Sequence, residues 1–166
     1  MLSVRKATIT DAKAMLNIYA PYVTGTCISF ETHVPTLEAF SARIEKGIKD
    51  YPYVVCEVGQ DIVGFAYASR HRERAAYNFS ADVSVYVSPA YHNRGIGKAL
   101  YGELFALLKS QAIYMLFAGI ALPNDASVGL HRSFGFKEVG VYHNVGYKFD
   151  KWLDVMWMEK SIKEIF

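Results

Sequence analysis

Residues 81–108 constrain the fold of this chain most, because a strand, a proline break, a glycine-bearing loop and an amphipathic helix follow one another there. Apolar and polar side chains alternate from Ala81 to Val87, as in a strand with one polar face. Pro89 ends that strand, since proline has no N–H group to donate to a neighbouring strand. Apolar residues then recur at helical spacing: Ile96, Ala99, Leu100, Leu104, Leu107 and Leu108. The order predicts a helix that packs its apolar stripe against a sheet.

The loop before this helix reads His92-Asn93-Arg94-Gly95-Ile96-Gly97-Lys98 and predicts a phosphate-binding site. At a helix start, unpaired N–H groups and the macrodipole favour an anion, and residues without a Cβ let a ligand approach the backbone. Arg94 and Lys98 add positive charge. The alternative is that Gly95 and Gly97 only permit a tight turn. Neither a P-loop nor a dinucleotide fingerprint is present, since no Gly-Lys-Ser/Thr follows and position 100 is leucine.

The rest of the chain alternates between predicted helices and strands. Strands are expected over residues 4–7, 53–58, 62–69, 114–121, 136–142 and 153–159. Helices are expected after the cap Thr10, from Pro35-Thr36 to Gly47, and over 126–134. The strand at 114–121 follows a helix and should therefore lie parallel to the strand at 81–87. These elements predict a mixed α/β domain with three layers and a right-handed crossover.

Composition excludes several other classes of protein. The chain has 18 basic and 16 acidic residues, so no strong basic field favours a nucleic-acid partner. Its apolar stretches are far shorter than the roughly 20 residues that span a bilayer, and the amino end lacks an apolar signal core, so we expect no membrane partner and a cytoplasmic location. Cys27 and Cys56 lack metal or redox spacing and are expected to be reduced core thiols. The five histidines are too scattered to predict a metal site.

Two motifs carry a resemblance to a known family. Residues 92–97 resemble motif A of the GNAT superfamily of acyl-CoA-dependent N-acetyltransferases, Gln/Arg-x-x-Gly-x-Gly/Ala, although His92 departs from its first position. Residues 124–136, from Asn124-Asp125-Ala126-Ser127 to Gly135-Phe136, are similar to motif B. Segments at 29–31, 72–87 and 145–155 resemble the phosphinothricin and methionine-sulfoximine acetyltransferase branch of this superfamily.

The resemblance implies a GNAT-like three-layer fold over residues 1–166, with a central mixed, mostly antiparallel sheet of about seven strands flanked by helices. It also implies that acetyl-CoA binds along the strand at 81–87 and on the loop after it. The implied acetyl-CoA contacts are Val85, Tyr86, Val87, His92, Asn93, Arg94, Gly95, Ile96, Gly97, Lys98, Asn124 and Ser127. For Asn124, a helix cap is a nearly equal alternative. The branch further implies a homodimer.

Asp82 and His131 are the expected catalytic residues. Asp82 stands where the branch has glutamate, which helps to remove a proton from the substrate amine. Because aspartate is shorter by one methylene, a path through one water is expected. His131 stands where many GNAT enzymes have a tyrosine acid, and an imidazole can serve as acid or base. The alternatives are a strand residue bonded to neighbouring backbone for Asp82 and a hydrogen-bonded core residue for His131.

The expected substrate is a small L-amino-acid analogue with a free α-amine and a tetrahedral polar head, such as phosphinothricin, methionine sulfoximine or methionine sulfone. Arg72 and Arg74 suit its acidic oxygens, because a guanidinium donates paired hydrogen bonds. Phe30 and Tyr77 suit its short aliphatic stem. A solvated loop and ordinary core packing are the alternatives for these residues. Acetylation of protein amino termini and a noncatalytic acyl-CoA sensor are the rival functions.

Overall fold

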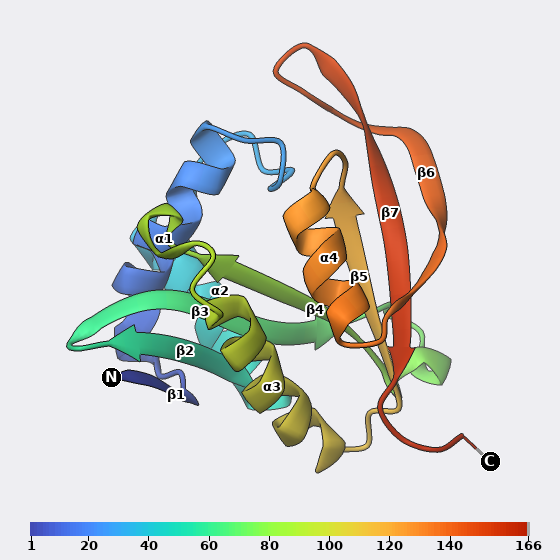
Figure 1. Cartoon of the computed structure of the whole chain (residues 1–166), viewed down its shortest axis with the longest axis horizontal. Helices are drawn as coiled ribbons and strands as arrows, with labels where there is room; N and C mark the ends of the chain where they lie inside the picture. The colour runs from blue at the N-terminus through green and yellow to red at the C-terminus, as the bar shows by residue number, and fades with distance from the viewer. Residues whose placement is uncertain (166) are drawn as a thin grey trace.

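The computed structural model describes residues 1–165 as one mixed sheet with helices on both faces. The seven strands lie in the order β1-β2-β3-β4-β5-β7-β6 (Figure 1). Their bounds are β1 Leu2–Lys6, β2 Tyr53–Val58, β3 Asp61–Arg70, β4 Ser80–Val87, β5 Met115–Ala121, β6 Lys137–Lys148 and β7 Lys151–Ser161. The helices are α1 Ala12–Thr24, α2 Leu37–Asp50, α3 Ile96–Lys109 and α4 Asp125–Ser133, with short 3-10 turns η1 Ile9–Asp11, η2 Ala75–Tyr77 and η3 Pro89–Tyr91.

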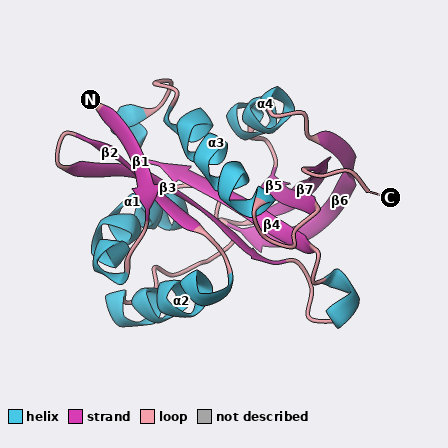
Figure 2. Ribbon diagram, turned by 90° about the horizontal axis from the view of Figure 1, so that it is seen from below, coloured by secondary structure: helices cyan, strands magenta, loops and turns pink. Residues whose placement is uncertain are grey.

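The layers follow from the apolar stripes of the helices. Helices α1 and α2 cover one face of the sheet, and α3 and α4 lie on the other (Figure 2). On α3 the predicted stripe is buried, with Leu100, Leu104 and Leu108 fully inaccessible. A Cβ on Gly64 of β3 would lie 3.0 Å from Ile96 and 3.1 Å from Leu100, so this glycine lets α3 pack closely on the sheet. The predicted three-layer architecture is confirmed.

The sheet divides where β4 meets β5. These strands are parallel, as predicted, but they pair only over Ser80–Asp82 and Met115–Phe117. Beyond that point they diverge, so that β1–β4 form one arm and β5, β7 and β6 form the other (Figure 1). The edge of β4 that faces β5 is therefore unpaired from Val83 onward. This separation positions the site described below.

Two predicted helix features and one predicted strand end are wrong. Gly47 does not end α2, because the ring of Tyr53 packs over it and the helix continues to Asp50. Helix α2 ends before Pro52, because a proline disfavours helical geometry in the residue before it, here Tyr51. Thr10 does not cap α1: the carboxylate of Asp11 accepts the Thr8 N–H at 2.8 Å, and η1 precedes the helix. The strand predicted at 136–142 continues to residue 148, because β6 and β7 remain paired beyond the end of β5.

The two thiols differ in burial. Cys56 is fully buried in β2, as predicted. Cys27 lies half-exposed in the loop after α1, so the expectation of a core thiol is wrong there. Among the described residues, 1–165, no helix has the length and apolar character needed to cross a membrane.

Candidate active site

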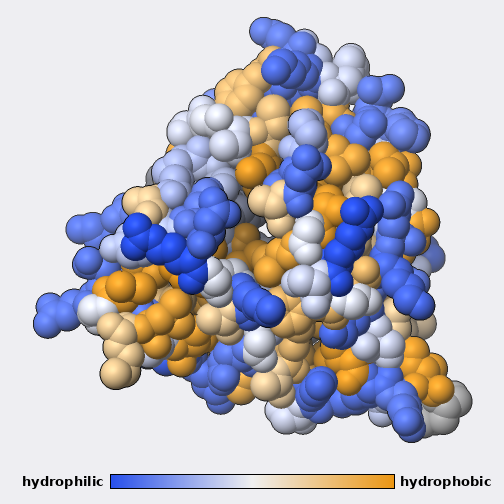
Figure 3. All heavy atoms as spheres, viewed as in Figure 1, coloured by the Kyte–Doolittle hydropathy of each residue, from blue (hydrophilic) through white to orange (hydrophobic). Residues whose placement is uncertain are grey.

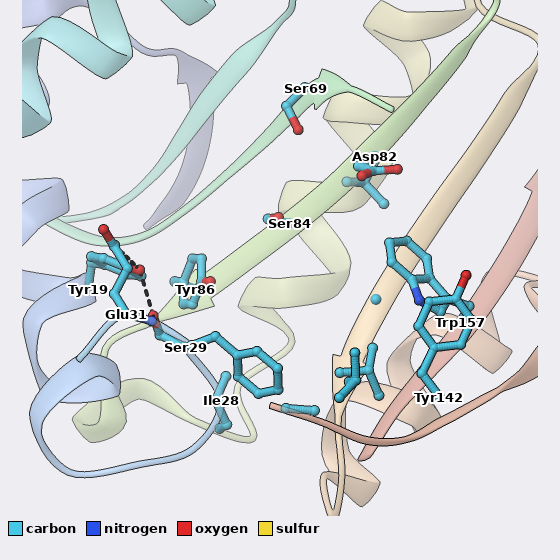
Figure 4. A pocket seen from close by; sticks show the side chains of 16 residues that line it. Tyr19, Ile28, Ser29, Glu31, Ser69, Asp82, Ser84, Tyr86, Tyr142 and Trp157 are labelled. Carbon is cyan, nitrogen blue, oxygen red and sulfur yellow. Dashed lines mark hydrogen bonds between the residues drawn. The ribbon is translucent and has the colours of Figure 1, made fainter. Parts of the chain in front are cut away.

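A cavity of about 670 Å³ opens between the two arms of the sheet (Figure 4). Polar side chains of β3 and β4 line one wall: Ser69, Asp82 and Ser84. Aromatic side chains from the opposite arm and from the loop after α1 line the others: Phe30, Tyr142 and Trp157. Figure 3 shows the molecule hollowed near the middle of this view, with apolar residues inside the hollow. The cavity thus combines an apolar body with a few polar groups, as ligand sites commonly do.

Asp82 contributes a carboxylate to the cavity wall at the point where β4 and β5 separate. Nδ1 of His71, the residue after β3, donates a hydrogen bond to its Oδ1 at 2.6 Å. Burial raises the pKa of Asp82 above its ordinary value, and the hydrogen bond from His71 offsets part of that rise. His71 could not be selected from the sequence, because the path of the turn over residues 71–79 determines which side chain reaches Asp82.

His131 is buried on α4 and lies in a hydrogen-bonded pair with Tyr101 of α3. Its Nδ1 lies 2.7 Å from the carbonyl oxygen of Ser127, which can only accept, so Nδ1 carries the proton. Nε2 then accepts from the Tyr101 hydroxyl at 2.9 Å. Burial lowers the pKa of His131, which favours this neutral form. Tyr101 could not be selected from the sequence as a site residue, because it lies beside the apolar stripe of α3 and reads as part of the core.

The pair borders a second, smaller cavity of about 60 Å³. It shares wall residues with the larger cavity, among them Val83, Ser84 and Tyr86 of β4. Asn124 and Ser127 also line it. The side chain of Asn124 accepts the backbone N–H of Ser127 at 3.2 Å, so the alternative role as a helix cap is present as well. The two expected catalytic residues therefore border neighbouring cavities with shared wall residues, Asp82 the larger and His131 the smaller.

The loop before α3 has the geometry that a phosphate group needs. Asn93 and Gly95 have left-handed backbone conformations, with φ of 60° and 75°, directly before the first turn of α3. Such a turn leaves backbone N–H groups free at the positive end of the helix dipole. Arg94 and Lys98 are exposed beside it. These residues fit the pyrophosphate of a CoA thioester.

His92 and Gly97 have contacts within the protein. Nε2 of His92 lies 3.1 Å from the carbonyl oxygen of Val87 and 2.8 Å from the Tyr22 hydroxyl, so it holds the end of β4 against α1. A Cβ on Gly97 would lie 3.2 Å from the Leu130 side chain. Gly97 therefore allows α4 to approach α3, a packing reason that the sequence did not reveal.

Of the four expected substrate contacts, only Phe30 lines the cavity. Arg72 donates to the carbonyl oxygen of His71 at 3.2 Å and lies 5.9 Å from the Trp157 ring. Tyr77 packs its edge against the His71 ring at 5.7 Å. Arg74 is exposed on the same turn. The turn lies behind Asp82 rather than in the cavity wall, so direct contact by Arg72, Arg74 and Tyr77 stays a prediction.

Groups from the loop after α1 close the other end of the cavity. Glu31 forms an ion pair with Arg43 of α2 and accepts a hydrogen bond from Tyr19 at 2.5 Å (Figure 4). Arg43 lowers the pKa of Glu31, so this carboxylate is ionised. Lys148 at the end of β6 is buried and donates to the carbonyl oxygen of Ser29 at 2.7 Å. The tip of the β6–β7 hairpin is thus fixed to the loop that carries Phe30.

Comparison with known proteins decides the family. The model of the acetyltransferase (GNAT) domain matches residues 4–157, which is most of the chain. The chain belongs to the GNAT acetyltransferase family. The predicted enzyme class, an acetyl-CoA-dependent N-acetyltransferase, is confirmed with it. Within residues 1–165 no group of three or more His, Cys, Asp or Glu side chains could hold a metal ion.

Individual members of the GNAT family resemble the chain over nearly its full length. Phosphinothricin N-acetyltransferase of Streptomyces coelicolor is 38% identical over 97% of this chain and 96% of its own. L-methionine sulfoximine/L-methionine sulfone acetyltransferase of Pseudomonas paraeruginosa is 32% identical over 96% and 94%. A phosphinothricin acetyltransferase of Sinorhizobium meliloti, solved in complex with AcCoA, has a TM-score of 0.93 at 31% identity over 96% and 88%. The predicted resemblance and fold are confirmed.

Proposed function

We propose that this enzyme transfers an acetyl group from acetyl-CoA to the α-amine of a small amino-acid-like substrate of the phosphinothricin, methionine sulfoximine or methionine sulfone type. The observation that carries the proposal is the position of Asp82. Asp82 lies in the wall of the large cavity, which shares wall residues with the smaller cavity beside His131 and Tyr101. The names of the relatives support the same class of substrate.

In the proposed complex, the loop from Asn93 to Lys98 holds the pyrophosphate with backbone N–H groups. The unpaired edge of β4 from Val83 to Val87 offers hydrogen bonds to the pantetheine arm, with Asn124 and Ser127 across the smaller cavity. Acetyl-CoA supplies an activated acetyl group as a thioester. The site must hold that group near both Asp82 and the Tyr101–His131 pair.

The proposed reaction needs two proton transfers from the substrate nitrogen and one to the CoA thiolate. The substrate enters as an ammonium ion, and Asp82 accepts one proton, directly or through one water. The free amine attacks the carbonyl carbon, the C–N bond forms and the C–S bond breaks. The departing CoA thiolate takes the proton of the Tyr101 hydroxyl, and the second proton that the nitrogen loses restores this hydroxyl. Neutral His131 has its single ring proton on Nδ1, bonded to Ser127, so its Nε2 only accepts from Tyr101 and orients that hydroxyl.

Two further features belong to the proposal, a homodimer and a cytoplasmic location. The β6–β7 hairpin exposes large apolar side chains that the rest of the chain leaves uncovered: Tyr142, Val145, Tyr147, Phe149 and Trp152. Apolar and aromatic residues of this kind are typical of homodimer interfaces.

The decisive experiment measures CoA release with acetyl-CoA and a panel of free amines. The panel contains phosphinothricin, methionine sulfoximine, methionine sulfone, ordinary amino acids and short peptides. Efficient turnover of the tetrahedral analogues, with weak turnover of peptides, is expected. Efficient peptide acetylation with inert amino-acid analogues would support the amino-terminal acetyltransferase instead. Acetyl-CoA binding with no release for any amine would support the noncatalytic sensor.

A further inference from the structure

His71 and Asp82 form the best-defined polar pair in the cavity region. The Nδ1–Oδ1 distance of 2.6 Å is short for an N–H···O bond, as expected when the acceptor is charged. A carboxylate can only accept, so Nδ1 carries the proton and Nε2 is left with a lone pair whenever the imidazole is neutral. Within residues 1–165 the structure gives Nε2 no hydrogen-bond partner. The pair can therefore take up one further proton without losing the bond between its members.

The His71 ring is held in one orientation by packing. It stacks on Phe117 of β5 with ring centroids 4.3 Å apart. Trp157 of β7 and Tyr77 of η2 meet it edge-on at 6.1 and 5.7 Å. A ring packed on three sides keeps Nδ1 aimed at Asp82, and it in turn fixes the carboxylate that lines the cavity.

A second histidine–aspartate pair in the chain differs from the His71–Asp82 pair in its exposure to solvent. On the β6–β7 hairpin, Nδ1 of His143 lies 3.1 Å from Asp154. There 73% of the histidine side chain is exposed, against 11% for His71. Solvent weakens the exposed pair, whereas the buried pair has little competition from water. The two pairs share a chemistry but differ in environment.

We propose that His71 is the positioning residue for Asp82 and that the two side chains accept the substrate proton as one hydrogen-bonded unit. This inference rests on the proposed role of Asp82 as the base. The unit gains the proton that leaves the substrate ammonium ion and later releases it to solvent. Burial raises the pKa of Asp82 and so disfavours the ionised form that can act as a base, and the hydrogen bond from His71 opposes that effect.

Other titratable groups lie around the pair. They are Arg72 on the same turn, Tyr77 on η2, Tyr67 on β3, and Glu159 of β7, which lies opposite Phe117 in the β5–β7 register. Arg72 favours the ionised form of Asp82 through its charge. Because these groups remain in every variant below, differences between variants report on His71.

The test compares two substitutions of His71. His71→Asn keeps an N–H donor near the position of Nδ1 but cannot titrate, and His71→Phe keeps an aromatic ring but removes the donor. We expect His71→Phe to lower kcat about 10- to 100-fold, as loss of an orienting partner does in metal sites. The acid limb of its kcat/KM profile should move to higher pH, because the interaction that most strongly offsets the burial of Asp82 is then lost. His71→Asn should recover much of kcat and place the limb at lower pH than in His71→Phe.

Controls separate this inference from the proposed function. L-Methionine sulfoximine is the amine, acetyl-CoA affinity and circular dichroism report folding, and His143→Phe should leave kcat unchanged. If Asp82→Asn retains full activity, the base assignment itself fails. If Asp82→Asn is inactive but both His71 variants keep the wild-type kcat and acid limb, only the role of His71 is overturned. An equal loss at every pH with no shift of the limb also overturns it.

A measurement without substrate tests the His71–Asp82 hydrogen bond even if the amine chosen for the assay is not acetylated. Nitrogen-15 NMR of the histidine side chains, with His71 assigned from His71→Asn, shows which ring nitrogen of His71 carries the proton. The hydrogen bond to Asp82 predicts a proton on Nδ1 in the wild type and loss of that preference in Asp82→Ala, which has no acceptor. A wild-type His71 with its proton on Nε2, or an unchanged preference in Asp82→Ala, overturns the proposal, whichever amine the enzyme acetylates and whether or not His71→Phe folds.

Discussion

At the residue scale, the Tyr101–His131 pair offers a direct test of the acid role. Tyr101→Phe removes one hydroxyl and leaves Nε2 of His131 buried without a donor. We expect kcat to fall by about 10²- to 10⁴-fold, the usual range for general acid–base assistance, with acetyl-CoA affinity nearly unchanged. The unpaired nitrogen should also lower the free energy of unfolding by about 1–3 kcal/mol. Steady-state kinetics and chemical denaturation measure the two effects.

His131→Ala should also reduce kcat, because the Tyr101 hydroxyl loses the acceptor that orients it. Full activity in either variant would remove that residue from the proposed mechanism. A loss in Tyr101→Phe but not in His131→Ala would assign the proton to the tyrosine alone. Calorimetric titration with acetyl-CoA shows whether either loss arises from binding instead.

At the same scale, the burial of Asp82 fixes the direction of the pH dependence. Its pKa is raised, chiefly by burial, and only the ionised carboxylate can accept a proton. Activity should therefore be present above the raised pKa and fall as the pH drops through it, at a higher pH than for an exposed aspartate. A profile of kcat/KM against pH for the wild type and for Asp82→Asn checks this. Persistence of the acid limb in an active Asp82→Asn enzyme would contradict it.

At the scale of elements, the β4–α3 unit could be predicted because its evidence is local. Alternation over 81–87 and the helical stripe from Ile96 to Leu108 determine both elements without distant contacts. The cavity depends on features with no local pattern. The separation of β4 from β5 follows from where β7 pairs, and the turn at 71–79 brings His71 to Asp82 while keeping Arg72 out of the cavity wall. Asp82, His131 and Phe30 came from the family resemblance, whereas His71 and Tyr101 needed the fold.

The packing of α4 on α3 gives a prediction at this scale. Gly97→Val places side-chain atoms against Leu130, whose nearest carbon lies only 3.2 Å from the new Cβ. Overpacking of this kind typically costs about 1–3 kcal/mol. Because α4 carries Asn124 and His131, we expect both a lower melting temperature and weaker acetyl-CoA binding. Thermal unfolding and calorimetry measure these effects.

Gly102→Ala on the same helix is the matched control for Gly97→Val. Nothing lies within 4 Å of a Cβ at Gly102. Alanine there should raise stability by about 0.5–1 kcal/mol through helix propensity and leave acetyl-CoA affinity unchanged. Unchanged stability and affinity in Gly97→Val would show that Leu130 moves aside freely, and would remove both the packing and the binding argument for this glycine.

At the scale of the whole molecule, the β6–β7 hairpin links assembly to the cavity. Its tip exposes Trp152, of which 66% is accessible, while Lys148 and Gly146 on the same hairpin contact the loop that carries Ser29 and Phe30. Burial of the hairpin against a second copy would remove apolar surface from water and would hold one wall of the cavity in place. Assembly and substrate binding should therefore change together.

Trp152→Ser tests this connection. We expect light scattering at micromolar concentration to give the mass of a dimer for the wild type and a smaller average mass for the variant, because the variant loses a large apolar contact. KM for the amine should rise while KM for acetyl-CoA stays the same, since the loop before α3 lies on the other arm of the sheet. Phe79→Ser removes an aromatic side chain that is 56% exposed, outside the hairpin, and should leave the mass unchanged. A wild-type enzyme that is monomeric at this concentration would exclude the dimer, and a monomeric variant with an unchanged KM for the amine would show that the cavity is complete in one chain.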